Sequence, residues 1–247
     1  MTFSILGHCR DSGQIGLALT SVTMGVGGIS PCYGYGGDIV VVQAKGNPRA
    51  AIAGVRSLDA GHSLEDTLHA VIAADNHVEY RQIAIMRRDG AMIARTGRDN
   101  QPWAGEKEGR DCLAFGNVLK GPEVVAAMAD AFDGSAGAAL AARLITALEA
   151  GRDAGGQRSA DGRHFSERGA AVKVIGAPEL PEVPLLDLRV DLKFDAVSEL
   201  RRVYEVYEPM IALRALRAAH PDRTPVLWDW EHENMSAKPP PDMFYED

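Results

Sequence analysis

Short runs in which apolar residues cluster or alternate with polar ones recur along the first half of the chain, and this pattern is typical of β-strands. Such runs occupy residues 2–9, 15–21, 38–44, 79–87, 91–96 and 112–116, and two more follow at 169–175 and 185–192. Turn-rich residues separate the first pair, and Arg88-Asp89-Gly90 separates a later one as a hairpin turn. The predicted strand pairs are therefore antiparallel.

Apolar residues recur at helical spacing between these strand runs. From Pro48 to about Asp75 the pattern predicts two helices, broken at Gly61-His62. Asn47 is expected to cap the first of them, with Pro48 at its first helical position, and Ser63 offers a cap for the second. Further helices are predicted over 121–132, 138–150 and 197–220.

Three segments lack either period and are expected to be loops. Residues 24–37 hold six glycines, 97–111 are polar, and 151–167 are polar and glycine-rich. The segment from Pro221 onward is too rich in proline for a helix, yet it carries Trp228, Trp230 and Phe244. Such a tail either packs across a surface or a neighbouring subunit, or lies over its own domain.

Antiparallel strand pairs separated by paired helices predict an α+β fold in layers, and they disfavour a parallel doubly wound sheet. With 247 residues, of which 46% are hydrophobic, the chain is long enough to bury a sizeable core. We expect one layered domain over residues 1–220 and a C-terminal tail over 221–247.

The charge balance excludes some partners. Asp and Glu number 34 against 26 Lys and Arg, a formal net charge of -8, which disfavours nucleic acid and membrane surfaces as ligands. The longest apolar stretches are far shorter than the roughly 20 residues of a membrane span. The N-terminus has no cationic start before an apolar segment, so a cytoplasmic location is expected.

No pattern indicates a cofactor or a metal. Glycine-rich fingerprints for dinucleotides or phosphates are not present. Cys9, Cys32 and Cys112 are widely spaced, which suits reduced thiols, and the seven histidines show no ligand spacing. The expected chemistry therefore uses groups of the chain itself, without metal or cofactor.

Thr2 follows the initiator methionine at the head of the first predicted strand. Removal of Met1 would give this threonine both a hydroxyl and a free α-amine, which titrates near 8 and can take the hydroxyl proton. Thr2 would then be its own nucleophile and base. A retained Met1 would turn the amine into an amide and block this mechanism.

Other residues are candidates for supporting roles. Asn117, at the end of a strand, is either an oxyanion donor or a turn asparagine. Arg49 can clamp a carboxylate, and Arg81 is either functional or solvated. The candidate substrate contacts are Asn47, Arg49, Arg81 and Trp103.

Ordered motifs along most of the chain, from Thr2 to about Pro209, resemble the bacterial and archaeal domain-of-unknown-function family 1028 (DUF1028). They are Thr2-Phe3-Ser4-Ile5, Gly13-Gln14-Ile15-Gly16-Leu17-Ala18-Leu19, Val42-Gln43-Ala44 with Asn47-Pro48-Arg49, Glu79-Tyr80-Arg81-Gln82, Pro102-Trp103-Ala104-Gly105, Gly116-Asn117-Val118-Leu119 and Asp187-Leu188-Arg189-Val190-Asp191.

That family resembles the N-terminal-nucleophile (Ntn) hydrolases. The resemblance implies four layers, helix, sheet, sheet, helix, and cleavage of an amide bond by a nucleophile that heads the first strand. Thr2 and Asn117 match the nucleophile and the oxyanion donor by position. The prediction is an Ntn-type amidohydrolase for a small amide substrate, without metal or cofactor, in a homo-oligomer. The alternative is a non-catalytic binding or assembly protein on the same fold.

Overall fold

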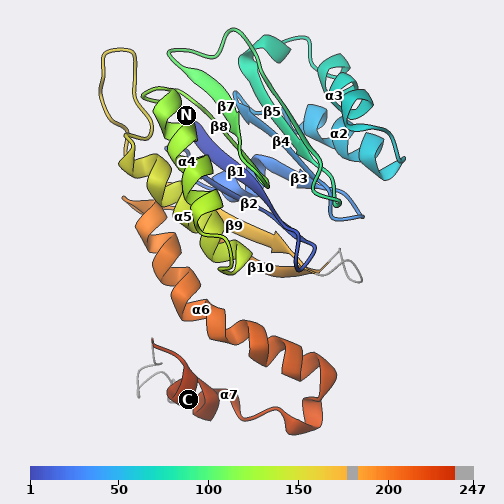
Figure 1. Ribbon diagram of the computed structural model, residues 1–247, viewed down its shortest axis with the longest axis vertical. Coiled ribbons are helices and arrows are strands. Elements are labelled where there is room, and N and C mark those ends of the chain that lie inside the picture. The colour runs from blue at the N-terminus through green and yellow to red at the C-terminus, as the bar shows by residue number, and fades with distance from the viewer. Residues whose placement is uncertain (177–182, 237–247) are drawn as a thin grey trace, which may run out of the picture. The chain divides into compact units, whose positions relative to one another are not determined.

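Two antiparallel sheets lie face to face in the first of two compact units, residues 1–200, of the computed structural model (Figure 1). The structure describes residues 1–176 and 183–236. The larger sheet contains β1 (Thr2–Cys9), β2 (Gln14–Ser21), β7 (Ala104–Glu108), β8 (Cys112–Asn117), β9 (Gly169–Ile175) and β10 (Pro184–Val190). The smaller sheet contains β3 (Pro31–Tyr33), β4 (Ile39–Ala44), β5 (Arg81–Met86) and β6 (Met92–Thr96).

The N-terminal strand β1 is central in the larger sheet, whose strand order is β10-β9-β2-β1-β8-β7. It pairs with β2 on one side and β8 on the other. The smaller sheet has the sequential order β3-β4-β5-β6. A central strand covered on both faces needs apolar or satisfied polar side chains on both, and residues 2–7 are all buried.

Helices cover the outer face of each sheet (Figure 1). The pair α4 (Pro122–Gly134) and α5 (Leu140–Asp153) packs on the larger sheet. The pair α2 (Pro48–Asp59) and α3 (Leu64–Ala73) packs on the smaller one. Between the sheets lies an apolar core that includes Leu17, Phe115, Val41 and Met86. The predicted fold class, a four-layer αββα sandwich with antiparallel sheets, is confirmed.

The helix starts follow the capping chemistry that the sequence predicts. The Asn47 side chain accepts hydrogen bonds from the backbone N–H groups of Arg49 and Ala50, at 3.1 and 3.4 Å, with Pro48 at the first helical position. Ser63 accepts from the Asp66 N–H at 3.1 Å. These caps satisfy donors that would otherwise lack partners.

Two of the predicted loops contain regular structure. Residues 104–108 form the edge strand β7, which pairs with β8. Their polar sequence does not predict a strand, because an edge strand exposes most of its side chains. The glycine-rich segment holds the short helix α1 (Val26–Ile29) and the strand β3. Gly25, just before α1, has a φ of 66°, a conformation that suits glycine.

The second compact unit comprises residues 201–247 and contains most of α6 (Ala196–Ala219), a short 3₁₀ turn η2 (Pro221–Arg223) and α7 (Leu227–Asn234). The expectation that the tail holds no helix is therefore wrong for residues 227–234, because Pro221 and Pro225 precede the helix and do not interrupt it. The triple proline at 239–241 and Phe244 lie outside the described residues.

Candidate active site

Thr2 begins β1 and pairs directly with Ser21 of β2 and with Asn117 of β8. Residues paired across an antiparallel ladder point to the same face of the sheet. This is the face toward the second sheet, because Asn117 reaches Gln82 of β5 from it. The structure thus brings the two predicted catalytic residues, Thr2 and Asn117, side by side, and both are buried.

The Ser21 hydroxyl forms hydrogen bonds with both Thr2 and Met1. Thr2 Oγ1 donates to Ser21 Oγ at 3.2 Å, and Ser21 Oγ donates to the Met1 carbonyl at 2.6 Å. Ser21 Oγ also accepts from the Thr23 N–H at 3.0 Å. Burial lowers the pKa of the Met1 α-amine below its usual value. The surroundings of the N-terminus therefore favour a neutral amine.

A chain of buried polar side chains links the two sheets next to Thr2. Ser4 Oγ donates to Gln43 Oε1 at 2.7 Å, and Gln43 Nε2 donates to Gln82 Oε1 at 2.9 Å. Asn117 Nδ2 donates to the same Gln82 oxygen at 3.2 Å. Gln82 Nε2 donates in turn to the carbonyls of Gly116 and Gly105 and to Thr96 Oγ1. Such a network fixes its members because each would be costly to leave unpaired.

Asn117 keeps unused hydrogen-bonding capacity. Its Oδ1 is buried and has no partner among the described residues. Its Nδ2 carries two N–H groups and makes one hydrogen bond, to Gln82. A buried amide with a spare acceptor and a spare donor is a group that can receive a polar ligand.

Arg81 and Asn47 meet on a buried carboxylate, that of Asp75 in the segment after α3. Arg81 Nε and Asn47 Nδ2 each lie 2.7 Å from Asp75 Oδ2. Arg81 also donates to the Lys45 carbonyl. Burial raises the pKa of Asp75, but the hydrogen bonds from Arg81, Asn47 and the His77 N–H and the Arg81 charge outweigh it, giving a pKa of about 2. Both side chains thus already hold an anion.

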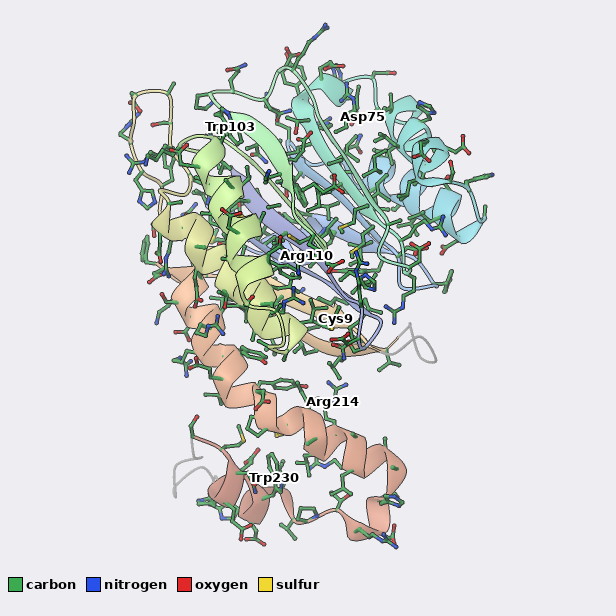
Figure 2. All side chains as sticks on the ribbon, viewed as in Figure 1. Cys9, Asp75, Trp103, Arg110, Arg214 and Trp230 are labelled. Atoms are coloured by element: carbon green, nitrogen blue, oxygen red, sulfur yellow. The ribbon has the colours of Figure 1, made fainter. Side chains whose placement is uncertain are left out.

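Arg49 and Trp103 lie in two other parts of the fold, at the start of α2 and just before β7. Arg49 is exposed in the first turn of α2 and makes no side-chain hydrogen bond or ion pair in the part of the chain that the structure describes. Trp103 lines a pocket of about 490 Å³ together with Thr96, Asn100 and Glu106. Thr2 does not line this pocket. Figure 2 shows Trp103 and Asp75 toward the same end of the sandwich.

Ser21, Gln43 and Gln82 are site residues that sequence reasoning missed. The signal for the two glutamines is a polar residue inside an otherwise apolar strand, within Ile39–Ala44 and Arg81–Met86. A buried strand that contains a glutamine requires a partner for its amide, and here each glutamine supplies the other's.

The described residues contain no cluster of three or more His, Cys, Asp or Glu side chains placed to hold a metal ion. None of their helices has the length and apolar character needed to cross a bilayer.

The fold and the site define an αββα sandwich in which a hydroxyl residue heads a central strand and faces an asparagine on the next. The sequence profile of a family of unknown function, DUF1028, matches residues 2–200, and the chain belongs to that family.

A solved structure from the same family agrees with this assignment. The crystal structure of protein SPO2555 from Silicibacter pomeroyi, a DUF1028 protein, is 27% identical and superposes with a TM-score of 0.71, covering 90% of this chain and 93% of that one. Anbu (ancestral beta-subunit) from Yersinia bercovieri is 14% identical, with a TM-score of 0.40 over 91% of this chain and 99% of that one. No curated protein matches the chain.

Proposed function

We propose that this protein is an amidohydrolase of the N-terminal-nucleophile type, in which Thr2 is the first residue of the mature chain and attacks a small amide substrate. One observation carries the proposal: Thr2 is paired with Asn117 and hydrogen-bonded to Ser21 on one buried face. The αββα layer order resembles that of the Ntn hydrolases, in which a residue at this position is the nucleophile.

The reaction needs only groups of the chain and water. Thr2 Oγ1 attacks the amide carbonyl carbon, and the α-amine of Thr2 takes the hydroxyl proton. Asn117 Nδ2 donates to the developing oxyanion. The ammonium then gives its proton to the leaving nitrogen as the C–N bond breaks, which leaves an ester on Thr2. Water, deprotonated by the same amine, hydrolyses this ester.

The surroundings support each role. Burial lowers the pKa of the Met1 amine, so this end of β1 disfavours a charged ammonium, and a terminal amine here can accept the hydroxyl proton in its neutral form. Gln82 holds the Asn117 amide in place, so its donor needs no reorganisation during the reaction. Ser21 Oγ, 3.2 Å from Thr2 Oγ1, positions the nucleophile.

A cation near the site would hold a substrate carboxylate. Arg49, which has no ion partner among the described residues, is the better cation for a substrate carboxylate; Arg81 would have to leave Asp75. Trp103 and Asn47 stay candidate contacts. The cytoplasmic location and the homo-oligomer also stay predictions.

The test compares one protein in two forms. A removable leader is fused directly before Thr2, and half of the preparation is then cut so that Thr2 becomes residue one. Both forms are treated with a β-lactone, which acylates nucleophilic hydroxyls, and with a panel of small amides; intact mass and peptide mapping locate the acyl group. We expect acylation at Thr2 and turnover only in the cut form.

Variants of the cut form sharpen this test. Thr2→Ala should abolish both signals, and Thr2→Ser should retain part of each. Loss of one oxyanion donor in Asn117→Ala should lower turnover by about 10²–10³-fold. Asn76→Ala, at an exposed asparagine, is the matched control and should change nothing. Turnover that survives Thr2→Ala, or equal acylation with the leader attached, would overturn the proposal.

A second candidate, a non-catalytic binding or assembly protein, is favoured by the hydrogen bond of 2.6 Å from Ser21 Oγ to the Met1 carbonyl. With Met1 in place this bond is made and Thr2 has no free amine. Intact mass of protein from its native host separates the two candidates. A chain lacking methionine, about 131 Da lighter, supports the hydrolase, and a chain that always keeps it supports the binding protein.

A further inference from the structure

A second cavity lies at the other end of β1, about 23 Å from Thr2 at about 3.3 Å per strand residue. Its volume is about 610 Å³, and it lies between the β1–β2 hairpin and the connection from α4 to α5. Cys9, Ser12, Arg110 and Arg143 are among its lining residues. Figure 2 shows Cys9 and Arg110 toward this end of the sandwich. The proposed hydrolase mechanism makes no use of it.

Arg143, on α5, brings a buried cation to the wall of this cavity. Arg143 is only 7% exposed, and its guanidinium lies 3.9 Å from the centroid of the Phe132 ring. Nε and Nη2 donate to the Phe132 carbonyl at 3.4 and 3.2 Å. Nη1 has no hydrogen bond, and the guanidinium has no carboxylate partner, within the described ranges 1–176 and 183–236. A buried cation without a counter-ion is costly, so this arrangement favours an anion.

Three acidic residues line the cavity: Asp111 and Asp133 have partners, and Asp11 is exposed and forms no ion pair among the described residues. Asp111 forms an ion pair with Arg10 at 2.5 Å. Both carboxylate oxygens of Asp133 accept from the backbone N–H of Arg110, at 3.0 and 3.3 Å. Neither carboxylate lies within ion-pair distance of Arg143. The unpaired Nη1 edge therefore remains open to a ligand from the cavity.

Cys9 lies on the helix-facing side of β1. It is on the same side as Gly7, which is packed against Phe132 and Leu144. The Ser12 hydroxyl and the backbone of Ser12 and Asp11 hydrogen-bond to its thiol. Burial raises the pKa of the Cys9 thiol, but these hydrogen bonds and the charge of Arg143 outweigh it, and the pKa falls below its usual value.

The pKa values of the other two thiols shift in the opposite direction. Burial raises the pKa of Cys32, and it raises that of Cys112 to about 12, with Asp133 adding to the effect. Cys9 is thus the thiol that ionises most easily, and Cys32, which is also partly exposed, provides an internal comparison.

We infer that this cavity binds a small organic disulfide carrying a carboxylate, which Arg143 holds, and that Cys9 forms a mixed disulfide with it. The Cys9 thiolate attacks one sulfur of the bound disulfide, the S–S bond breaks, and the other half leaves as a thiolate. The Cys9 sulfur is oxidised and the departing sulfur is reduced, so no further oxidant is needed. This inference does not depend on activity at Thr2.

The test uses two disulfides of opposite character. The intact chain is treated with 5,5′-dithiobis(2-nitrobenzoate), which carries two carboxylates, and with neutral 2,2′-dithiodipyridine. Peptide mapping assigns each rate to Cys9 or Cys32. After each rate is divided by that of a simple free thiol, Cys9 should prefer the anionic reagent over the neutral one by about tenfold or more, as one charge-assisted contact provides. Cys32 should show no such preference.

Competition keeps the test independent of any substitution. In the unaltered protein, 4-nitrobenzoate, which has the carboxylate but no disulfide, should slow the reaction of Cys9 with the anionic reagent and leave its reaction with the neutral one unchanged. Arg143→Gln should remove the preference and Arg143→Lys should keep part of it, with circular dichroism reporting that each variant folds. Arg163→Gln, at an exposed cation that does not line this cavity, is the control and should leave the preference unchanged.

Three results would overturn the inference: Cys9 and Cys32 with the same preference, no competition by 4-nitrobenzoate, or an unchanged preference in folded Arg143→Gln.

Discussion

The polar side chains at the two ends of β1 lie in different surroundings. At the Thr2 end, amides and hydroxyls from both sheets satisfy one another in a buried network centred on Gln82. At the Cys9 end, the strand borders a cavity of about 610 Å³, and Nη1 of Arg143 in its wall has no hydrogen bond among the described residues. The first end holds its polar groups in one geometry, whereas the second leaves a buried cation facing an open cavity.

Each end also carries an arginine–aspartate pair, and the pairs differ in burial. The side chains of Arg81 and Asp75 are 15% and 3% exposed, whereas those of Arg10 and Asp111 are 69% and 16% exposed. The buried pair needs further donors, from Asn47 and the His77 N–H, to compensate the carboxylate for lost water. Similar ion-pair distances therefore do not imply similar energies.

The largest effect is expected at the buried network. Gln82→Ala removes an amide that serves Gln43, Asn117 and Thr96, and it leaves a cavity. The free energy of unfolding should fall by roughly 3–5 kcal/mol, measured by urea denaturation. Lys107→Ala, at an exposed position of β7, is the control. A loss below about 1 kcal/mol would show that the network contributes little.

A smaller effect is expected from acid at the buried ion pair. The pKa of Asp75 falls from 3.8 to about 2 on folding, so its stabilising effect is present above pH 4 and is lost as the pH falls from about 4 to about 2. Urea midpoints across this range should drop less steeply in Asp75→Asn than in the unaltered protein. Parallel pH curves for the two proteins would contradict this assignment.

The smallest effect is expected at the exposed pair. Arg10→Ala should change the free energy of unfolding by less than about 0.5 kcal/mol, because a solvated arginine gains little from its partner. The same urea titration measures it, and added salt should narrow the difference further. A loss as large as that of Gln82→Ala would mean that the two ends are equivalent.

Much of the fold follows from patterns within single elements. Apolar runs located β1, β2 and β4, and Asn47-Pro48 located the start of α2, because burial and capping are local signals. Strand β7 was missed because an edge strand with the sequence Ala-Gly-Glu-Lys-Glu carries no apolar period. Helix α7 was missed because the prolines near it suggested a break.

The site was predictable only in part. Thr2 and Asn117 stand at recognisable positions, the head of one strand and the end of another. Their pairing depends on β8 lying beside β1, and the role of Gln82 depends on the distance between two sheets. Arg81 resembled a free cation until the structure placed Asp75 against it. Contacts across layers have no period in the sequence.

Because β1 is central in its sheet, it can be enclosed only after later strands have been synthesised. Its first residues cannot be enclosed until β8, more than a hundred residues later, has been synthesised and paired with them. At about 5–20 residues per second, this leaves the N-terminus open to a processing enzyme for roughly 5–20 s. Once the sheet closes, Thr2 is buried and Ser21 holds the residue before it. A processing enzyme therefore meets the terminus in two states: open on the nascent chain and, after the sheet closes, with Met1 still exposed but hydrogen-bonded to Ser21.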